Sequence, residues 1–77
     1  MNSSITKDFR ELFAKLPPKL QLEARKNYRL WQANPRHPSL HFKRVGDYWS
    51  ARVTMDFRVL GRVEDDTIYW FWITGIP

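Results

Sequence analysis

The stretch from Tyr48 to Thr74 constrains the fold of this chain more than any other part of the sequence. Apolar and polar residues alternate through residues 48–54 and again through residues 57–64, and many of them are aromatic or β-branched. A period of two with such residues is typical of strands that bury one face. Residues 67–74 form a third run, which is apolar on both faces. We therefore expect three consecutive antiparallel strands over these ranges.

The first turn of this stretch can be assigned from the faces of its two strands. A three-residue loop at residues 54–56 collects the apolar residues of both strands on one face, whereas a two-residue loop would mix the faces. The same register sets Arg52 directly opposite Arg58, although like charges in opposing positions destabilise a sheet. We interpret this arginine pair as an anion-binding site. The expected core-face pairs are Val53–Phe57, Ala51–Val59 and Trp49–Gly61.

A two-residue loop at Asp65-Asp66 is expected to form the second turn. The core-face pairs are then Val63–Ile68, Gly61–Trp70 and Val59–Trp72. The opposite face of the sheet, which we call the open face, would combine cations, phenol rings and an apolar strip. Its expected members are Tyr48, Arg52, Arg58, Leu60, Arg62, Tyr69, Phe71 and Ile73. In so small a protein an exposed apolar strip marks a partner site, so Leu60, Phe71 and Ile73 are predicted to bind a partner.

Two helices are predicted before the strands. Apolar residues from Ile5 to Leu16 follow one helical stripe, which predicts a helix over about residues 6–16. Pro17-Pro18 ends it, and Pro18 can open the next helix at its first position. A second stripe predicts a helix over about residues 18–33, which ends before Pro35.

The remaining segment is a loop that proline stiffens, followed by a first strand over about residues 40–45. All elements together form one domain over residues 1–77. The predicted fold class is α+β, with an N-terminal helical hairpin packed on one face of a four-stranded, mainly antiparallel sheet.

Charge and composition narrow the classes of partner. The formal net charge is +5, and residues 19–44 hold seven basic residues against Glu23 alone. A small basic domain favours polyanions or acidic proteins, although a basic helix face can also be merely solvated. There is no cysteine, no secretory signal and no apolar run of the roughly 20 residues that a membrane helix needs. We expect a cytoplasmic protein without a membrane partner.

Several kinds of chemistry find no support in the sequence. The only histidines, His37 and His41, flank a proline loop, and no metal-binding or phosphate-cradling motif occurs. We therefore expect no metal, no cofactor and no small-molecule substrate. A basic and aromatic sheet face suits RNA, because arginines hold phosphates while aromatic rings stack on bases. We expect Lys43, Arg44, Arg62 and Tyr69 to bind nucleic acid; His41, Lys43 and Tyr69 are the candidate proton-transfer groups.

An ordered set of short motifs resembles the RelE/ParE superfamily of bacterial toxins from type II toxin–antitoxin systems. The resemblance covers Phe9 to Gly75. Its motifs are Phe13-x-x-Leu16-Pro17, the helix from Gln21 to Trp31, Asn34-Pro35-x-His37-Pro38-Ser39-Leu40-x-Phe42-Lys43, Trp49-Ser50-Ala51-Arg52-Val53, Phe57-Arg58-Val59-Leu60-Gly61 and Trp70-Phe71-Trp72-Ile73.

The resemblance implies a toxin that a cognate antitoxin neutralises. It implies an mRNA endonuclease that acts at the ribosome and represses translation, with Arg52 and Arg58 on the scissile phosphate as catalytic residues. Members of the family usually continue beyond the glycine that matches Gly75 with basic or histidine residues and then a tyrosine. The sequence here ends at Pro77, so the usual proton-transfer residues are missing and catalysis stays open. The alternatives are an antitoxin-binding relic without catalysis and a ParE-like inhibitor of DNA gyrase.

Overall fold

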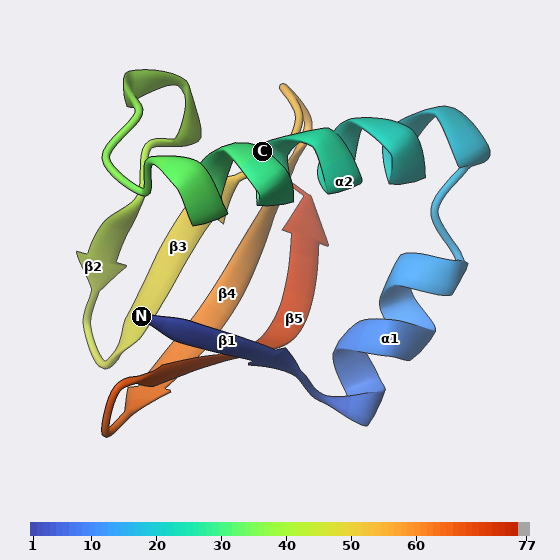
Figure 1. Ribbon diagram of the computed structural model, residues 1–77. Coiled ribbons are helices and arrows are strands. Elements are labelled where there is room, and N and C mark those ends of the chain that lie inside the picture. Colours follow the sequence, from blue (N-terminus) through green and yellow to red (C-terminus); the bar gives the residue numbers. More distant parts are fainter. Residues whose placement is uncertain (76–77) are drawn as a thin grey trace.

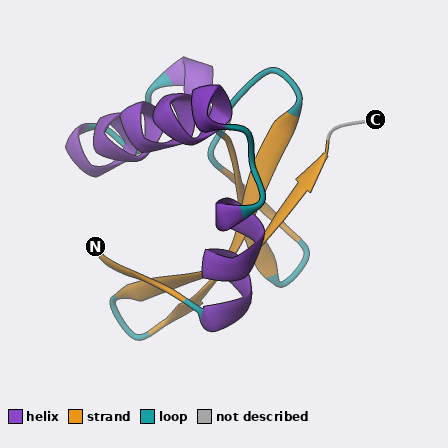
Figure 2. Ribbon diagram, turned by 90° about the vertical axis from the view of Figure 1, so that its right-hand side faces the viewer, coloured by secondary structure: helices purple, strands orange, loops and turns teal. Residues whose placement is uncertain are grey.

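The computed structural model describes residues 1–75, in which two helices lie on one side of a five-stranded sheet (Figures 1 and 2). The sheet order is β1-β5-β4-β3-β2. In chain order the elements are β1 (Asn2–Ile5), α1 (Lys7–Ala14), α2 (Pro18–Ala33), the 3-10 helix η1 (Pro38–Leu40), β2 (Lys43–Val45), β3 (Tyr48–Arg52), β4 (Phe57–Glu64) and β5 (Thr67–Gly75). The predicted α+β fold, a helical hairpin on one face of a largely antiparallel sheet, is confirmed.

The strand count is the first difference from the prediction, because the sheet has five strands rather than four. The additional strand, β1, runs parallel to the first half of β5, from Asn2 beside Thr67 to Ile5 beside Trp70. The residues of β1 show no alternation of apolar and polar side chains, and serines of the kind found here are common at the starts of helices. A strand that exists through pairing with a segment more than 60 positions away leaves no local pattern to recognise.

The first helix is shorter than predicted and has polar partners at both ends. Thr6 caps its start, because its hydroxyl accepts a hydrogen bond of 3.2 Å from the backbone N–H of Phe9. At its end the amide of Gln21, from α2, donates to the carbonyls of Phe13 at 3.2 Å and Leu16 at 3.0 Å. The carbonyl of Phe13 also accepts from the backbone N–H of Leu16, and Leu16 lies just beyond the end of the helix. The amide of Gln21 therefore ties α2 to the end of α1 and to the turn that follows it.

The second helix matches its prediction closely. It begins with Pro18 at the first helical position and extends to Ala33. Its Ala24 and Trp31 are buried in the core. The side-chain amide of Asn27 donates a hydrogen bond to the carbonyl of Val53, which ties α2 to the end of β3.

The predicted first strand is much shorter than expected. Residues 38–40 form η1, and His41 then adopts a left-handed backbone with φ of 46°. A strand cannot pass through either conformation, so β2 begins only at Lys43. It pairs with β3 as an antiparallel edge strand.

The predicted register of the first hairpin is confirmed. Ala51 faces Val59, and Arg52 faces Arg58. The loop is held by the buried Thr54, whose hydroxyl accepts hydrogen bonds of 3.1 Å from the backbone N–H groups of Asp56 and Phe57.

The second hairpin follows its prediction only up to Gly61. Glu64 pairs with Thr67 across the two-residue loop, and Gly61 pairs with Trp70 as expected. A β-bulge then shifts the register, so the next pair is Leu60 with Trp72 and Phe71 has no residue opposite. Figure 1 shows β5 bending about halfway along its length.

The bulge reverses the faces of the last residues of β5. Val59 faces Ile73, and the predicted pair of Val59 with Trp72 is wrong. Ile73 is 8% exposed and belongs to the core, whereas Trp72 is 44% exposed. The physical reason is that one extra residue in a strand moves every later side chain to the opposite face.

Aromatic rings fill much of the core between α2 and the sheet. The ring of Trp31 meets those of Trp70 and Phe42 edge-on, with centroids 5.5 and 5.7 Å away. Phe42 in turn stacks on Trp49 at 4.8 Å. These arrangements are favourable for aromatic pairs and contribute stability beyond simple burial.

Gly61 provides a direct test of this packing. A Cβ at this position would lie 2.8 Å from side-chain atoms of both Ile68 and Trp70. We expect Gly61→Ala to lower the free energy of unfolding by about 1–3 kcal/mol, because the buried side chains must move. Gly75→Ala is the matched control, since a Cβ there meets only the carbonyl oxygen of Asp56 at 3.8 Å. Equal stability of the two variants in urea denaturation would contradict the packing described.

Candidate functional site

The open face of the sheet, which points away from both helices, is the candidate site. The core-facing residues of the sheet show which side chains lie on the open face, because neighbours in a strand alternate between faces and the bulge changes the alternation once. These core-facing residues are Ala51, Val59, Trp70 and Ile73. Its members are Lys43, Tyr48, Arg52, Arg58, Leu60, Arg62, Tyr69, Phe71 and Trp72.

The Arg52–Arg58 pair lies near the end of the first hairpin, and both side chains are half-buried. The Nε atom of Arg52 is buried and has no hydrogen-bond partner. The one ion pair in residues 1–75 joins Lys7 to Glu11 on α1, so no carboxylate neutralises either arginine. Two arginines at directly opposing strand positions without a counter-ion form a favourable place for a phosphate, which guanidinium groups bind through paired hydrogen bonds.

Aromatic rings surround the third arginine of this face. The guanidinium of Arg62 lies 5.9 Å from the centroid of Phe71, within the range of a cation–π interaction. Tyr48 also packs against Phe71, with the two ring centroids 5.1 Å apart and the ring planes tilted by 58°. Arg62 also faces Tyr69 across the strands. The structure therefore brings Arg62, Tyr69 and Phe71 together, as the sequence predicted.

The apolar strip on this face differs from the predicted one. Leu60 and Phe71 are on the open face and half-buried, as expected. Ile73 is not on this face, and its assignment as a partner-binding residue is wrong because the bulge turns it into the core. Trp72 takes its place opposite Leu60. Sequence reasoning missed Trp72 because, in a run that is apolar on both faces, the pattern does not show which residues face the core.

The two basic residues of β2 point to opposite sides of the sheet. Lys43 pairs with Ser50 and lies on the open face. Arg44 pairs with Trp49, which packs in the core, so it belongs to the helix side. Its Nε donates a hydrogen bond of 3.0 Å to the carbonyl of Gly46. Arg44 and Lys43 therefore lie on opposite faces, because neighbours in a strand alternate, and the expectation that Arg44 binds nucleic acid stays a prediction.

Both histidines lie in the segment between α2 and β2. The Nδ1 atom of His37 lies 2.8 Å from the hydroxyl of Ser39 and accepts from its backbone N–H at 3.2 Å, which stabilises the local turn. His41 is exposed and ends η1. Residues 1–75 contain no cluster of three or more side chains suited to hold a metal. Among the same residues, neither helix is long and apolar enough to cross a membrane.

The open face therefore offers unpaired cations for a phosphate, aromatic rings for base stacking, and the phenol groups of Tyr48 and Tyr69 beside them. A surface of this kind fits single-stranded nucleic acid, where stacking and backbone contacts act together. It also fits an acidic protein segment with apolar anchors.

Comparison with solved structures shows which fold this is. The YoeB/ParE toxin from Agrobacterium tumefaciens matches with a TM-score of 0.74 at 14% identity, over 100% of both chains. A chain of the archaeal RelE–RelB complex from Pyrococcus horikoshii OT3 matches with a TM-score of 0.70 at 20% identity, over 96% of this chain and 92% of that one. The toxin–antitoxin complex RelBE2 from Mycobacterium tuberculosis gives a TM-score of 0.72 at 20% identity, over 97% and 96% of the two chains.

These likenesses show that the chain has the fold of RelE/ParE-type toxins, as the sequence resemblance implied. No protein-family model matches the chain, and no curated protein matches it.

The two neighbouring residues after the bulge provide a test of the face assignment. We expect Ile73→Ala to lower the free energy of unfolding by about 2–5 kcal/mol, because it leaves a cavity in the core. Trp72→Ala should cost about 1 kcal/mol or less, because its ring lies on the surface. Urea denaturation of both variants measures the difference. The reverse order would show that β5 continues without a bulge.

Proposed function

We propose that the chain is the toxin component of a type II toxin–antitoxin system, and that it represses translation by cutting mRNA at the ribosome. The observation that carries this proposal is the Arg52–Arg58 pair, two cross-strand guanidinium groups without a carboxylate partner among the described residues. The fold shared with toxins of this kind supports the same assignment.

The chemistry of RNA cleavage explains why such a pair is useful. The 2′-hydroxyl of RNA gives up its proton and attacks the neighbouring phosphate, so negative charge increases on the non-bridging phosphate oxygens as the new bond forms. The bond to the 5′ oxygen then breaks, that oxygen takes up a proton, and a 2′,3′-cyclic phosphate remains. Fixed cations at that point stabilise the transition state more than the ground state. In the proposed mechanism Arg52 and Arg58 hold the scissile phosphate, while Lys43 and Arg62 hold neighbouring phosphates. Tyr69 stacks on a base or donates a proton, and the ribosome supplies the mRNA.

A cognate antitoxin is the proposed protein partner. The structures from Pyrococcus horikoshii and Mycobacterium tuberculosis are complexes of a toxin with its antitoxin. An acidic segment with apolar anchors would neutralise the arginines and cover Leu60 and Phe71, with Trp72 beside them. We propose that both partners meet in the bacterial cytoplasm, where the mRNA is.

Salt dependence tests the RNA-binding part of the proposal. With about three phosphates contacted on single-stranded RNA, the logarithm of the binding constant should fall with a slope of about −2 against the logarithm of salt concentration. Arg58→Gln should weaken binding and make the slope shallower by about 0.7. Arg44→Gln is the matched control, because it removes an arginine from the opposite face. A slope near zero for the wild-type protein, or equal effects of both variants, would contradict RNA binding at the open face.

Expression in bacteria tests the activity itself. We expect the chain induced alone to arrest growth, and co-expression of the antitoxin to restore it. Sequencing of mRNA ends should locate new cuts within codons on translating ribosomes. The double variant Arg52→Gln/Arg58→Gln should remove both effects while it still binds the antitoxin through its apolar strip. Normal growth would indicate a relic without catalysis, and DNA breaks that depend on gyrase would indicate the gyrase-inhibiting class.

A further inference from the structure

The helical hairpin does not close over the sheet that it covers. No residue of α1 is fully buried, and α2 buries only Ala24 and Trp31. The large apolar residues on the inner side of α1, Phe9 and Phe13 among them, are only half-buried against the core. In a close-packed protein interior, aromatic rings on the inner side of a helix are normally covered more completely than this.

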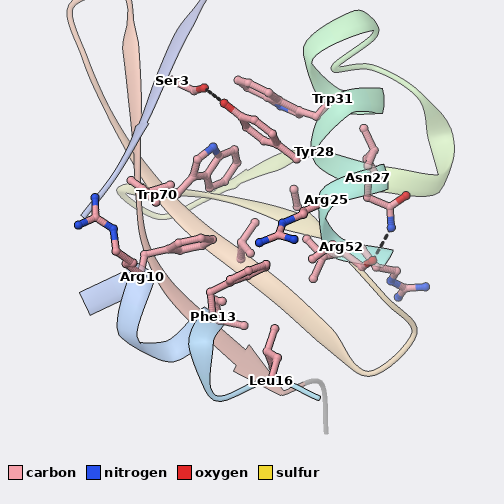
Figure 3. A pocket seen from close by; sticks show the side chains of 18 of the residues that line it. Ser3, Arg10, Phe13, Leu16, Arg25, Asn27, Tyr28, Trp31, Arg52 and Trp70 are labelled. Carbon is pink, nitrogen blue, oxygen red and sulfur yellow. Dashed lines mark hydrogen bonds between the residues drawn. The ribbon is translucent and has the colours of Figure 1, made fainter. Parts of the chain in front are cut away.

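A cleft of about 570 Å³ lies between the two helices, β1 and the sheet (Figure 3). Its floor is formed by core residues of the sheet, among them Ala51, Val59 and Ile73. Ala24 of α2 and Phe13 of α1 also line it. The volume is within the range of about 300–1,000 Å³ that is typical of sites for small ligands.

Polar contacts bridge this cleft in two places. The hydroxyl groups of Ser3 on β1 and Tyr28 on α2 form a hydrogen bond on one side. On another side the amide of Asn27 donates to the carbonyl of Val53. Both contacts attach α2 to the sheet at defined points, so the helix has limited freedom to move inward and fill the space.

The charges around the cleft have a single sign. Among the described residues that line it, three are arginines, Arg10, Arg25 and Arg52, and none is an aspartate or glutamate. The guanidinium of Arg25 lies 5.2 Å from the centroid of Phe13, which holds the charge at the edge of the apolar space. No carboxylate in residues 1–75 pairs with any of these arginines.

We propose that this cleft binds a small amphipathic anion, with an apolar body between the helices and the sheet and one carboxylate beside Arg25. An apolar chain would contact the surfaces of Phe9 and Phe13 that the protein leaves half-covered. The carboxylate would accept charge-assisted hydrogen bonds from the guanidinium of Arg25, which pairs with no carboxylate among residues 1–75. Arg52 is the one residue that the cleft shares with the open face, and the proposal does not depend on the function proposed for that face.

Dodecanoate is the probe for this site, used below the concentration at which it forms micelles. Titration into the full chain should raise the melting temperature with ligand concentration, because a ligand of the native state stabilises it by mass action. The fluorescence of Trp31 and Trp70, which line the cleft, should change in parallel. Dodecanol, which lacks the charge, should bind about tenfold more weakly, consistent with one charge-assisted contact.

Charge variants separate the specific contact from general attraction to a basic protein. Arg25→Gln should lower the affinity for dodecanoate to that for dodecanol and leave dodecanol binding unchanged. Arg29→Gln is the matched control, because Arg29 is an exposed residue of the same helix outside the cleft. Equal losses in the two variants would overturn the assignment of the carboxylate site.

A variant that fills the cleft tests the apolar part of the site. Ala24→Leu places a larger side chain into the space, so the protein should stay folded and lose dodecanoate binding. Ala33→Leu, the same change at an exposed position of α2, should retain it. The proposal is overturned if wild-type protein does not bind dodecanoate, or if both leucine variants bind it equally. Protection of Tyr28 and Trp31 by bound antitoxin, with no dodecanoate binding, would assign the cleft to a protein partner and also overturn it.

Discussion

The alternation of side chains along β3 and β4 is the constraint on which the rest of the structure depends. Burying Ala51 and Val59 against the helices allows one register only, because a slip by one residue would expose the whole apolar set. That register leaves Arg52 beside Arg58, at a cost in electrostatic repulsion. The core thus imposes the arrangement that makes the other face attractive to anions. The stability of the core and the function proposed for the open face therefore depend on the same pairing, on opposite sides of one sheet.

The sequence predicted the elements whose information is local. Prolines mark the boundaries of α2, and alternation sets the first hairpin down to the Arg52–Arg58 pair. The strand β1 was not predicted, because it depends on parallel pairing with a distant segment rather than on its own residues. The first predicted strand was too long, because the left-handed backbone of His41 is not apparent from residue type.

The candidate site shows the same division. The alternation of side chains along the strands predicted correctly that Arg58, Arg62 and Phe71 lie on the open face. The predicted faces of Ile73 and Trp72 were interchanged, because an aromatic run has no polar residue that shows where the alternation of faces changes. Arg44 and Lys43 were both assigned to nucleic-acid binding on their charge, whereas alternation in β2 places them on opposite faces. The roles of these residues in binding remain predictions that the proposed experiments address.

The two surfaces of the protein share a strand. Arg52 of β3 belongs to the arginine pair, and together with the residues on either side of it, Ala51 and Val53, it lines the cleft under α2. Any rotation of this strand about its own axis would move both surfaces together. The hydrogen bond from Asn27 to Val53 restrains that rotation from the helix side. A contact on the helix side of the sheet therefore restrains the backbone next to Arg52.

The bulge at Phe71 also affects how this chain should be compared with distant relatives. Against a relative whose last strand lacks this bulge, the extra residue in β5 acts as an insertion, so an alignment without a gap would match inward-facing residues with outward-facing ones beyond it. Substitution patterns taken from such an alignment would assign core constraints to Trp72 and surface freedom to Ile73. Placing the gap at Phe71 restores the correspondence, and profiles built in that way would describe the last strand by the environments its residues occupy.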